Sequence, residues 1–223
     1  MDGFFLGGSI APIGLSVSFL ASPAGHLVEE LIAWRRGLGQ RVEQSAPSVL
    51  PDCAAALDPL EAPWTTELLV DCGEWTAYLN NGIDGGDPTA AAPYLASRLQ
   101  VDCVIATHAP RHGPGHASTQ LWLLGPDGEP PLMYKRTLAA HAEDGRWSWH
   151  EAGSAQPFEQ LDRYRARLIK NRFDRLLLVQ YLSALGIHVD DAGFYGKGIA
   201  VRQRVTHPVR RETASEVRDR FGW

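Results

Sequence analysis

The stretch VDCVIATHAPRHGPGHASTQLWLLGPDGEPPLMYKRTLAAHAEDGRWSWHE, residues 101–151, decides the fold. It contains several short runs rich in apolar and β-branched residues, separated by glycine and proline. The runs span 101–107, 119–124, 132–138 and 147–151. Gly125-Pro126-Asp127-Gly128 and Asp144-Gly145 are typical hairpin turns. The pattern therefore predicts a meander of antiparallel strands, with residues 108–117 as a loop.

The residues before this meander predict a β-α unit and a hairpin. An apolar strand at 15–20 is followed by a helix at 23–37, in which Leu27, Leu31 and Trp34 recur at helical spacing. Two apolar runs around Gly73 predict a hairpin of 67–72 with 75–79, and Asp87 is expected to cap a helix at 88–99.

The residues after position 157 change to a helical pattern. We predict helices at 158–172 and 175–185, and a short one at 213–221. The fold class predicted is therefore α+β: a mostly antiparallel sheet of five to seven strands, with an N-terminal β-α unit and C-terminal helices packed on it.

The charge is divided unevenly along the 223 residues, whose net charge is −5. Residues 1–156 carry 8 basic and 18 acidic side chains, whereas residues 157–223 carry 13 basic and 8 acidic ones. We interpret 1–156 as an acidic α+β sheet region and 157–223 as a basic helical region of the same domain body, because opposite charges then pair internally. An overall acidic chain is not typical of a dedicated nucleic-acid binder.

The compartment is predicted from the cysteines and from the first apolar segment. Cys53, Cys72 and Cys103 are odd in number and form no CxxC pair, which favours reduced thiols in a cytoplasm over a disulfide scaffold or a cysteine zinc site. The uncharged segment 4–21 contains glycines and a proline and follows no basic residue, so we expect a buried strand in it and not a signal peptide or membrane span. No membrane association and no cofactor are expected.

Three histidines are the strongest candidates for catalytic chemistry. His108, His112 and His116 follow a His-x3-His-x3-His spacing that would suit one metal ion on a helix. Pro110, and the Gly-Pro-Gly run at 113–115, make a helix unfavourable, so a solvated loop tip competes with a metal site. Cys103 precedes this loop, and strand alternation predicts it to be a buried structural thiol rather than a nucleophile.

Aromatic residues on predicted strands are either core or anchors for a partner. Trp75 and Tyr78 lie on one predicted strand, and Asp84 and Asp87 lie in the turn that follows it. Because a strand, its turn and a helix cap converge there, these four residues are the predicted partner-binding set. The turn does not match a calcium loop or a phosphate-binding loop.

A basic run at 162–172 is the strongest charge signal. On a single helix, Arg163, Arg167 and Lys170 would lie on one side. They would contact nucleic-acid phosphates or another anion, or pair with the acidic residues of the same chain.

The run Trp75–Gly82, WTAYLNNG, is followed by Gly85 and Asp87 and resembles a WTAYxNNGxxGxD-like motif of an uncharacterised bacterial protein family. Gly145-Arg146-Trp147 and Pro157-Phe158-Glu159 resemble the same group, over about residues 60–195. The small acidic α+β character is similar in class to immunity proteins paired with bacterial toxins. The family motif implies no particular activity and carries over no functional residue, whereas the similarity in class to immunity proteins implies a protein partner such as a toxin.

The leading hypothesis is therefore a non-enzymatic cytoplasmic interaction protein that binds, and in an immunity-like way neutralises, a protein partner. One alternative is an enzyme that uses the three histidines, with or without a metal. The other is a nucleic-acid-associated protein that uses the basic C-terminal region.

Overall fold

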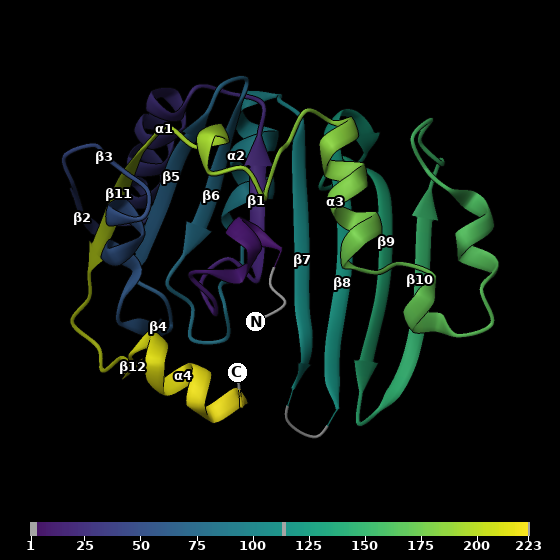
Figure 1. The fold of residues 1–223 in the computed structure, drawn as a ribbon. Helices are drawn as coiled ribbons and strands as arrows, with labels where there is room; N and C mark the ends of the chain where they lie inside the picture. Colours follow the sequence, from purple (N-terminus) through teal and green to yellow (C-terminus); the bar gives the residue numbers. More distant parts are fainter. Residues whose placement is uncertain (1–3, 113–114, 223) are drawn as a thin grey trace.

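A ten-stranded sheet forms the centre of the computed structural model, which describes residues 4–112 and 115–222 (Figure 1). The strands are β1 (Ser16–Leu20), β2 (Arg41–Gln44), β3 (Ser48–Val49), β5 (Thr66–Cys72), β6 (Trp75–Asn80), β7 (Cys103–His112), β8 (His116–Glu129), β9 (Tyr134–Glu143), β10 (Arg146–Gly153) and β11 (Lys197–Arg204). They lie in the order β10-β9-β8-β7-β1-β6-β5-β11-β2, with β3 also beside β11. The paired strands are antiparallel. The α+β class is confirmed, but the sheet is larger than the five to seven strands predicted.

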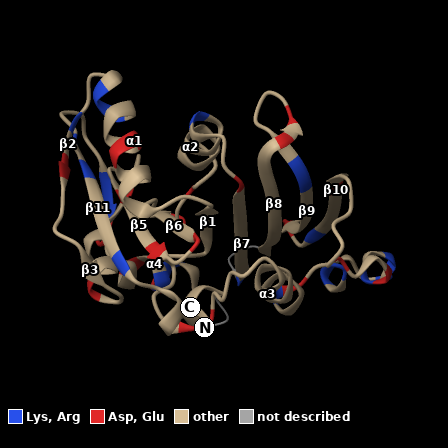
Figure 2. Cartoon of the chain, turned by 90° about the horizontal axis from the view of Figure 1, so that it is seen from above, with Lys and Arg blue, Asp and Glu red and all other residues tan. Residues whose placement is uncertain are grey.

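Helices cover both faces of this sheet (Figure 2). The helices α1 (Ala24–Gly37) and α2 (Ala91–Leu99) pack on one face, where Leu27, Leu31 and Leu95 are fully buried. The other face carries α3 (Arg175–Ala184) and α4 (Ala214–Phe221). It also carries the 3₁₀ helices η1 (Phe5–Gly8), η2 (Asp52–Leu57), η3 (Leu161–Arg165), η4 (Ile169–Asn171) and η5 (Ala192–Phe194). A small pair of β4 (Leu60–Ala62) and β12 (Arg210–Glu212) completes the fold.

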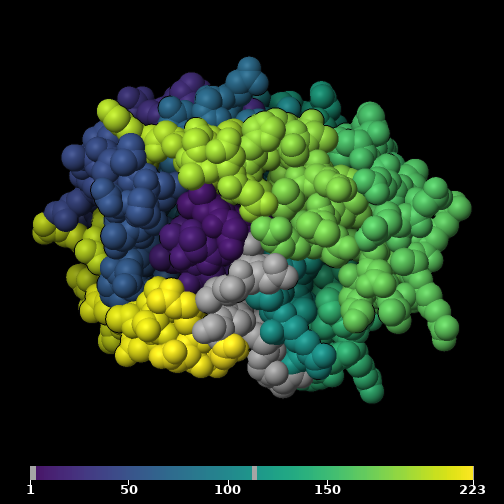
Figure 3. All heavy atoms as spheres, in the orientation of Figure 1, coloured from purple at the N-terminus to yellow at the C-terminus, as the bar shows by residue number. Residues whose placement is uncertain are grey.

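The N-terminal segment belongs to the core of the α3 face. Phe4 and Phe5 are buried, and Phe5 contacts the Tyr195 ring at a centroid distance of 4.9 Å. Figure 3 shows this segment in purple, surrounded by later parts of the chain. Strand β1, which follows it, lies in the middle of the sheet between β6 and β7, as expected for a buried strand. No helix in the described part of the chain is long and apolar enough to cross a membrane.

The C-terminal region is not purely helical. Strand β11 lies inside the sheet between β5 and β2, so residues 157–223 contribute to the sheet as well as to its cover. Arginines of this region pair with acidic residues of the first part of the chain: Arg204 with Glu43, and Arg211 with Glu61 at 2.7 Å. Basic side chains from residues 157–223 therefore form ion pairs with acidic side chains from residues 1–156.

Two local predictions are wrong. Residues 158–172 form η3 and η4 with an extended break at Ala166 and Leu168, instead of one helix. Helix α2 begins only at Ala91, and Asp87 accepts a hydrogen bond from the backbone N–H of Thr89 in the preceding turn. In both places the polar side chains bond to nearby backbone or to each other and so compete with a regular helix.

Candidate functional site

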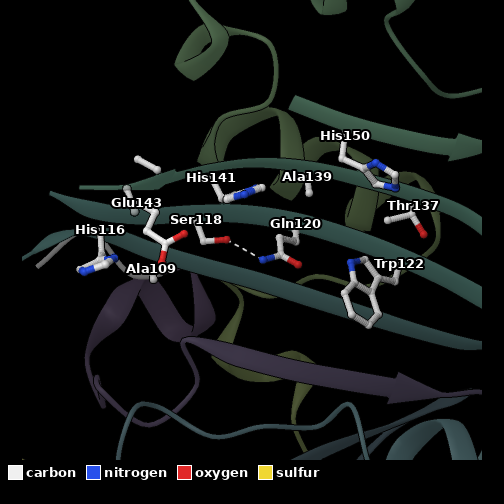
Figure 4. A pocket seen from close by; sticks show the side chains of 12 residues that line it. Ala109, His116, Ser118, Gln120, Trp122, Thr137, Ala139, His141, Glu143 and His150 are labelled. Atoms are coloured by element: carbon white, nitrogen blue, oxygen red, sulfur yellow. Dashed lines mark hydrogen bonds between the residues drawn. The ribbon is translucent and has the colours of Figure 1, made fainter. Parts of the chain in front are cut away.

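The face of the sheet that carries α1 and α2 is uncovered by helices over most of β8 and over β9 and β10 (Figure 2). In the described part of the chain α2 reaches only the Leu124 end of β8 on this face, and a groove of about 450 Å³ follows the uncovered strands. We call this surface the open face. Its side chains are Ala109, His116, Ser118, Gln120, Trp122, Thr137, Ala139, His141, Glu143 and His150 (Figure 4).

Strand alternation explains which side chains reach the open face. In β8, Leu121 and Leu123 point into the core under α3, so His116, Ser118, Gln120 and Trp122 point the other way. The register then places Ser118 opposite His141, and His141 opposite Ser148 of β10. Cross-strand neighbours of this kind have Cβ atoms about 5 Å apart, so the three strands present one continuous surface.

The open face carries hydrogen-bonding groups with little net charge. Gln120 Nε2 donates to Ser118 Oγ at 2.7 Å, as drawn in Figure 4. Trp122 is half-buried and meets Tyr134 edge to face, with ring centroids 6.0 Å apart. A half-exposed tryptophan among hydroxyl, amide and imidazole groups and small alanines suits contact with another protein surface, because it combines a rigid apolar anchor with adaptable hydrogen bonds.

The predicted histidine loop does not form one site. Strands β7 and β8 extend through it, so His108 and His116 lie in paired strands instead of a loop. His108 points to the α3 side, where its Nδ1 bonds Thr119 Oγ1 at 3.0 Å, and His116 points to the open face. The two rings lie on opposite faces and cannot bind the same metal ion. His112 belongs to β7, but its side chain lies outside the described residues.

Other histidines, cysteines and acidic residues in the described part of the chain form no metal site either. No group of three or more His, Cys, Asp or Glu side chains in that part of the chain is arranged to hold a metal ion. The strand geometry instead separates such residues along β8 and β9.

The predicted partner-binding set is not brought together either. Trp75 and Tyr78 point to opposite faces of β6, and Tyr78 is fully buried. Asp84 and Asp87 are exposed but lie beyond the other end of β6 from Trp75, and Asp84 pairs with Arg220 at 3.3 Å. Tyr78 is therefore a core residue, and the four residues form no common surface.

Tyr78 belongs to a buried polar cluster under α1. The Glu67 carboxylate accepts two hydrogen bonds from Arg35, at 2.5 and 3.1 Å, and one from the Tyr78 hydroxyl at 2.8 Å. Burial and the neighbouring Glu67 carboxylate hold the pKa of Tyr78 well above its usual value, so the hydroxyl remains a donor. The cluster fixes α1 to the sheet.

The two asparagines of the WTAYLNNG run are structural. The Asn80 side chain accepts from the N–H groups of Gly82 and Asp87, and Asn81 accepts from the N–H groups of Thr65 and Thr66. These bonds hold the turn after β6 and the start of β5 together, which accounts for an Asn-Asn-Gly sequence without a ligand.

The basic run is divided among different environments. Arg163 is exposed and pairs with Asp174 at 2.9 Å, whereas Arg167 lies in the break between η3 and η4. Lys170 lines a separate hollow of about 520 Å³ beside His108 and Arg175. Arg163, Arg167 and Lys170 therefore do not share a helix face, and the predicted cationic stripe is wrong.

All three cysteines are buried, and this gives a direct test of their reactivity. Burial raises the pKa of Cys72 to about 12 and raises the pKa values of Cys53 and Cys103 as well. At pH 8 we expect native protein to release almost no thionitrobenzoate from Ellman's reagent within minutes, and unfolded protein to release three equivalents. Rapid reaction of one native thiol would contradict this placement.

The open face was missed by sequence reasoning, although a signal for it exists. In residues 116–123, HASTQLWL, the apolar residues Ala117, Leu121 and Leu123 occupy alternate positions, with Thr119 as the one polar exception among them, which is typical of a strand with one polar face. The proline and glycines just before residue 116 favour a loop through residue 117, so the sequence does not predict that a strand begins at His116.

Comparisons with known proteins add no assignment. No protein-family model, curated protein or solved structure matches this chain. The resemblance to the uncharacterised bacterial family and to immunity proteins stays a prediction.

Proposed function

We propose that this protein is a non-enzymatic protein-binding module, and that the open face over β8–β10 is its contact surface. The observation that supports it is the groove along β8–β10, lined by Trp122, His141 and His150, on a sheet face whose other strands lie under α1 and α2. Sites for small molecules enclose most of their ligand, whereas this groove runs open along the strands and suits a larger partner. An immunity-like role, in which the partner is a toxin, is the form of this function that the class resemblance favours.

The residues of the open face suit a protein partner better than a nucleic acid. Among the residues that line the groove the only acid is Glu143, and the other polar side chains carry hydroxyl, amide and imidazole groups, with no lysine or arginine. A phosphate backbone would need several lysines or arginines in the groove. A protein surface needs an aromatic anchor and matched hydrogen bonds, which Trp122 and its neighbours supply.

The test uses the purified full chain and the protein encoded by the neighbouring gene. We expect the two proteins to form a complex at micromolar concentration or below, measured by calorimetry. Trp122→Ala should weaken it about 30-fold, which corresponds to about 2 kcal/mol for a buried aromatic anchor. The double variant His141→Ala/His150→Ala should weaken it at least about tenfold, because it removes two hydrogen-bonding groups from the same groove.

A matched double variant, His26→Ala/His207→Ala, removes two exposed histidines that lie outside the open face. It should bind like the parent protein. Equal losses in both double variants, an unchanged affinity of Trp122→Ala, or no complex at all would each contradict the proposed function. Circular dichroism and thermal unfolding confirm that each variant is folded.

A further inference from the structure

The outer edge of β10 is open. Strand β10 is the last strand of the sheet and pairs with β9 in one continuous register, from Arg146 opposite Glu143 to Gly153 opposite Arg136. In the described part of the chain no strand pairs with its other edge. The Ala152 and Gly153 carbonyls accept hydrogen bonds from Arg136, so the backbone groups available to a further strand lie along residues 146–151 of that edge.

The opposite edge of the sheet, strand β2, is protected against pairing with another chain, whereas the β10 edge is not. Strand β2 has only four residues, carries Arg41 and Glu43, and leads toward Pro47. Glu43 also pairs with Arg204 of the neighbouring strand. Short length, charges and proline are the usual features that prevent an edge from pairing with another chain. Strand β10 also carries two charged residues, Arg146 and Glu151, but it is twice as long, with eight residues, and has no proline or bulge.

We propose that β10 accepts an extended segment of the partner protein as an additional antiparallel strand. This inference rests on the proposed function and names the way the partner is held. Main-chain hydrogen bonds to β10 provide affinity, and the side chains of the added strand alternate between the two faces of the sheet. Those on one side continue the open face beyond Ser148 and His150.

Charge specifies one position of the added strand. The register places Arg146 opposite Glu143, and Glu143 lines the same groove as His116, so these three residues form a row across the open face with Arg146 outermost. Among the described residues Arg146 makes no ion pair, and its side chain is exposed. An aspartate or glutamate opposite Arg146 on the added strand would complete this row, since opposite charges on paired strands stabilise a register.

A second copy of this chain does not supply that acid. Two copies of β10 that pair as antiparallel strands are related by a two-fold axis perpendicular to the sheet. The same face of each copy then lies on the same side, so Arg146 would lie beside residues of its own face in the other copy. Those residues are Ser148, His150 and Ala152, and the only acid of β10, Glu151, lies on the other face. A partner segment with its own sequence is therefore the better match.

The α3 side of the edge favours apolar side chains at the alternate positions. Trp149 of β10 contacts Tyr164 of η3 at a centroid distance of 5.1 Å, and the segment with η3 and η4 extends past β10 in Figures 1 and 2. Leu161 and Leu168 of this segment are 51% and 54% exposed. The expected segment thus alternates apolar with polar residues and has an acid among the polar ones.

The test selects displayed random 12-residue peptides on the immobilised full chain. We expect enriched peptides with alternating apolar and polar residues and a fixed acidic position. Their binding should slow amide hydrogen exchange in residues 146–153. Arg146→Glu should weaken these peptides at least about tenfold and shift the selection from acidic to basic residues. Arg41→Glu, a matched change on the protected edge, should alter neither affinity nor selection.

Several results would overturn the inference. These are no enriched peptide, enriched peptides that leave exchange in 146–153 unchanged, the same selection on Arg146→Glu, or a concentration-dependent dimer that protects 146–153 without peptide. If the neighbour-encoded protein still binds and Trp122→Ala still weakens that complex, such a result excludes the added strand and leaves the proposed function intact. If peptides add to β10 but Trp122→Ala has no effect on the complex, the open face is not the contact surface.

Discussion

Replacing Arg35 by leucine is expected to lower the free energy of unfolding by about 3–5 kcal/mol. The substitution leaves the Glu67 carboxylate buried, with only the neutral Tyr78 hydroxyl at 2.8 Å and the Gln203 amide at 3.4 Å as side-chain donors. An uncompensated buried charge costs more than the ion pair contributes, because its hydration is lost. Urea unfolding followed by circular dichroism measures the change.

Two further variants identify the cause. Arg98→Leu breaks the exposed pair with Glu30 and should change stability by no more than about 0.5 kcal/mol. The double variant Arg35→Leu/Glu67→Leu removes both buried charges and should recover most of the loss, apart from about 1–3 kcal/mol for the Tyr78 hydroxyl left without its acceptor. A loss below about 1 kcal/mol in Arg35→Leu would show that Glu67 does not depend on this arginine.

Replacing Arg136 by methionine is expected to lower stability by about 3 kcal/mol and to release residues 154–172 from the sheet. Arg136 lies on β9 and donates to both oxygens of Glu159, at 2.7 and 2.9 Å, and to the Gly153 carbonyl at 2.9 Å. Glu159 is almost fully buried and also accepts from the Tyr164 hydroxyl at 2.9 Å. This cluster holds the chain after β10 against the α3 face.

Limited trypsin digestion measures the release. The segment contains cleavage sites at Arg163, Arg165, Arg167 and Lys170, and mass spectrometry should find faster cleavage there in Arg136→Met than in the parent protein. Arg204→Met, which breaks the exposed pair with Glu43, serves as the control and should leave these cleavage rates unchanged. Uniformly faster cleavage along the whole chain would mean global destabilisation and no local anchor.

Much of the sheet could be predicted from the sequence because the signals were local. Turn residues such as Asp144-Gly145 separate apolar runs, and β9 and β10 pair where that pattern places them. Helix α1 likewise follows the periodicity of Leu27, Leu31 and Trp34. Such elements need only their own residues and a near neighbour in the chain.

The remaining elements depend on distant parts of the chain. Strand β11 pairs with β5 and β2, more than 120 positions earlier in the sequence, and its Gly198 approaches the side chain of Cys53. Its Lys-Gly-Ile-Ala-Val-Arg sequence carries no turn that identifies these neighbours. Tyr78 was misassigned because its buried donor role depends on Glu67 and Arg35, which come from other elements.

The open face could not be predicted from local sequence patterns, because it too depends on distant parts of the chain. A polar strand face becomes a surface only if no helix covers it, and the positions of α1 and α2 over the rest of the sheet are tertiary information. The histidine spacing was misleading because strands β7 and β8 continue past Pro110 and separate His108 from His116 by the thickness of the sheet.

Hydroxyl-radical footprinting of the complex with the neighbour-encoded protein tests the open face most directly, because it reports on individual side chains. Trp122, His141 and His150 lie on the open face, whereas Trp147 and Trp149 pack on the α3 side of the same part of the sheet. We predict that complex formation lowers oxidation of Trp122, His141 and His150 several-fold and leaves Trp75, which lies on the α3 side of β6 away from β10, unchanged. Unchanged oxidation of these three residues, with protection elsewhere on the chain, would contradict the account.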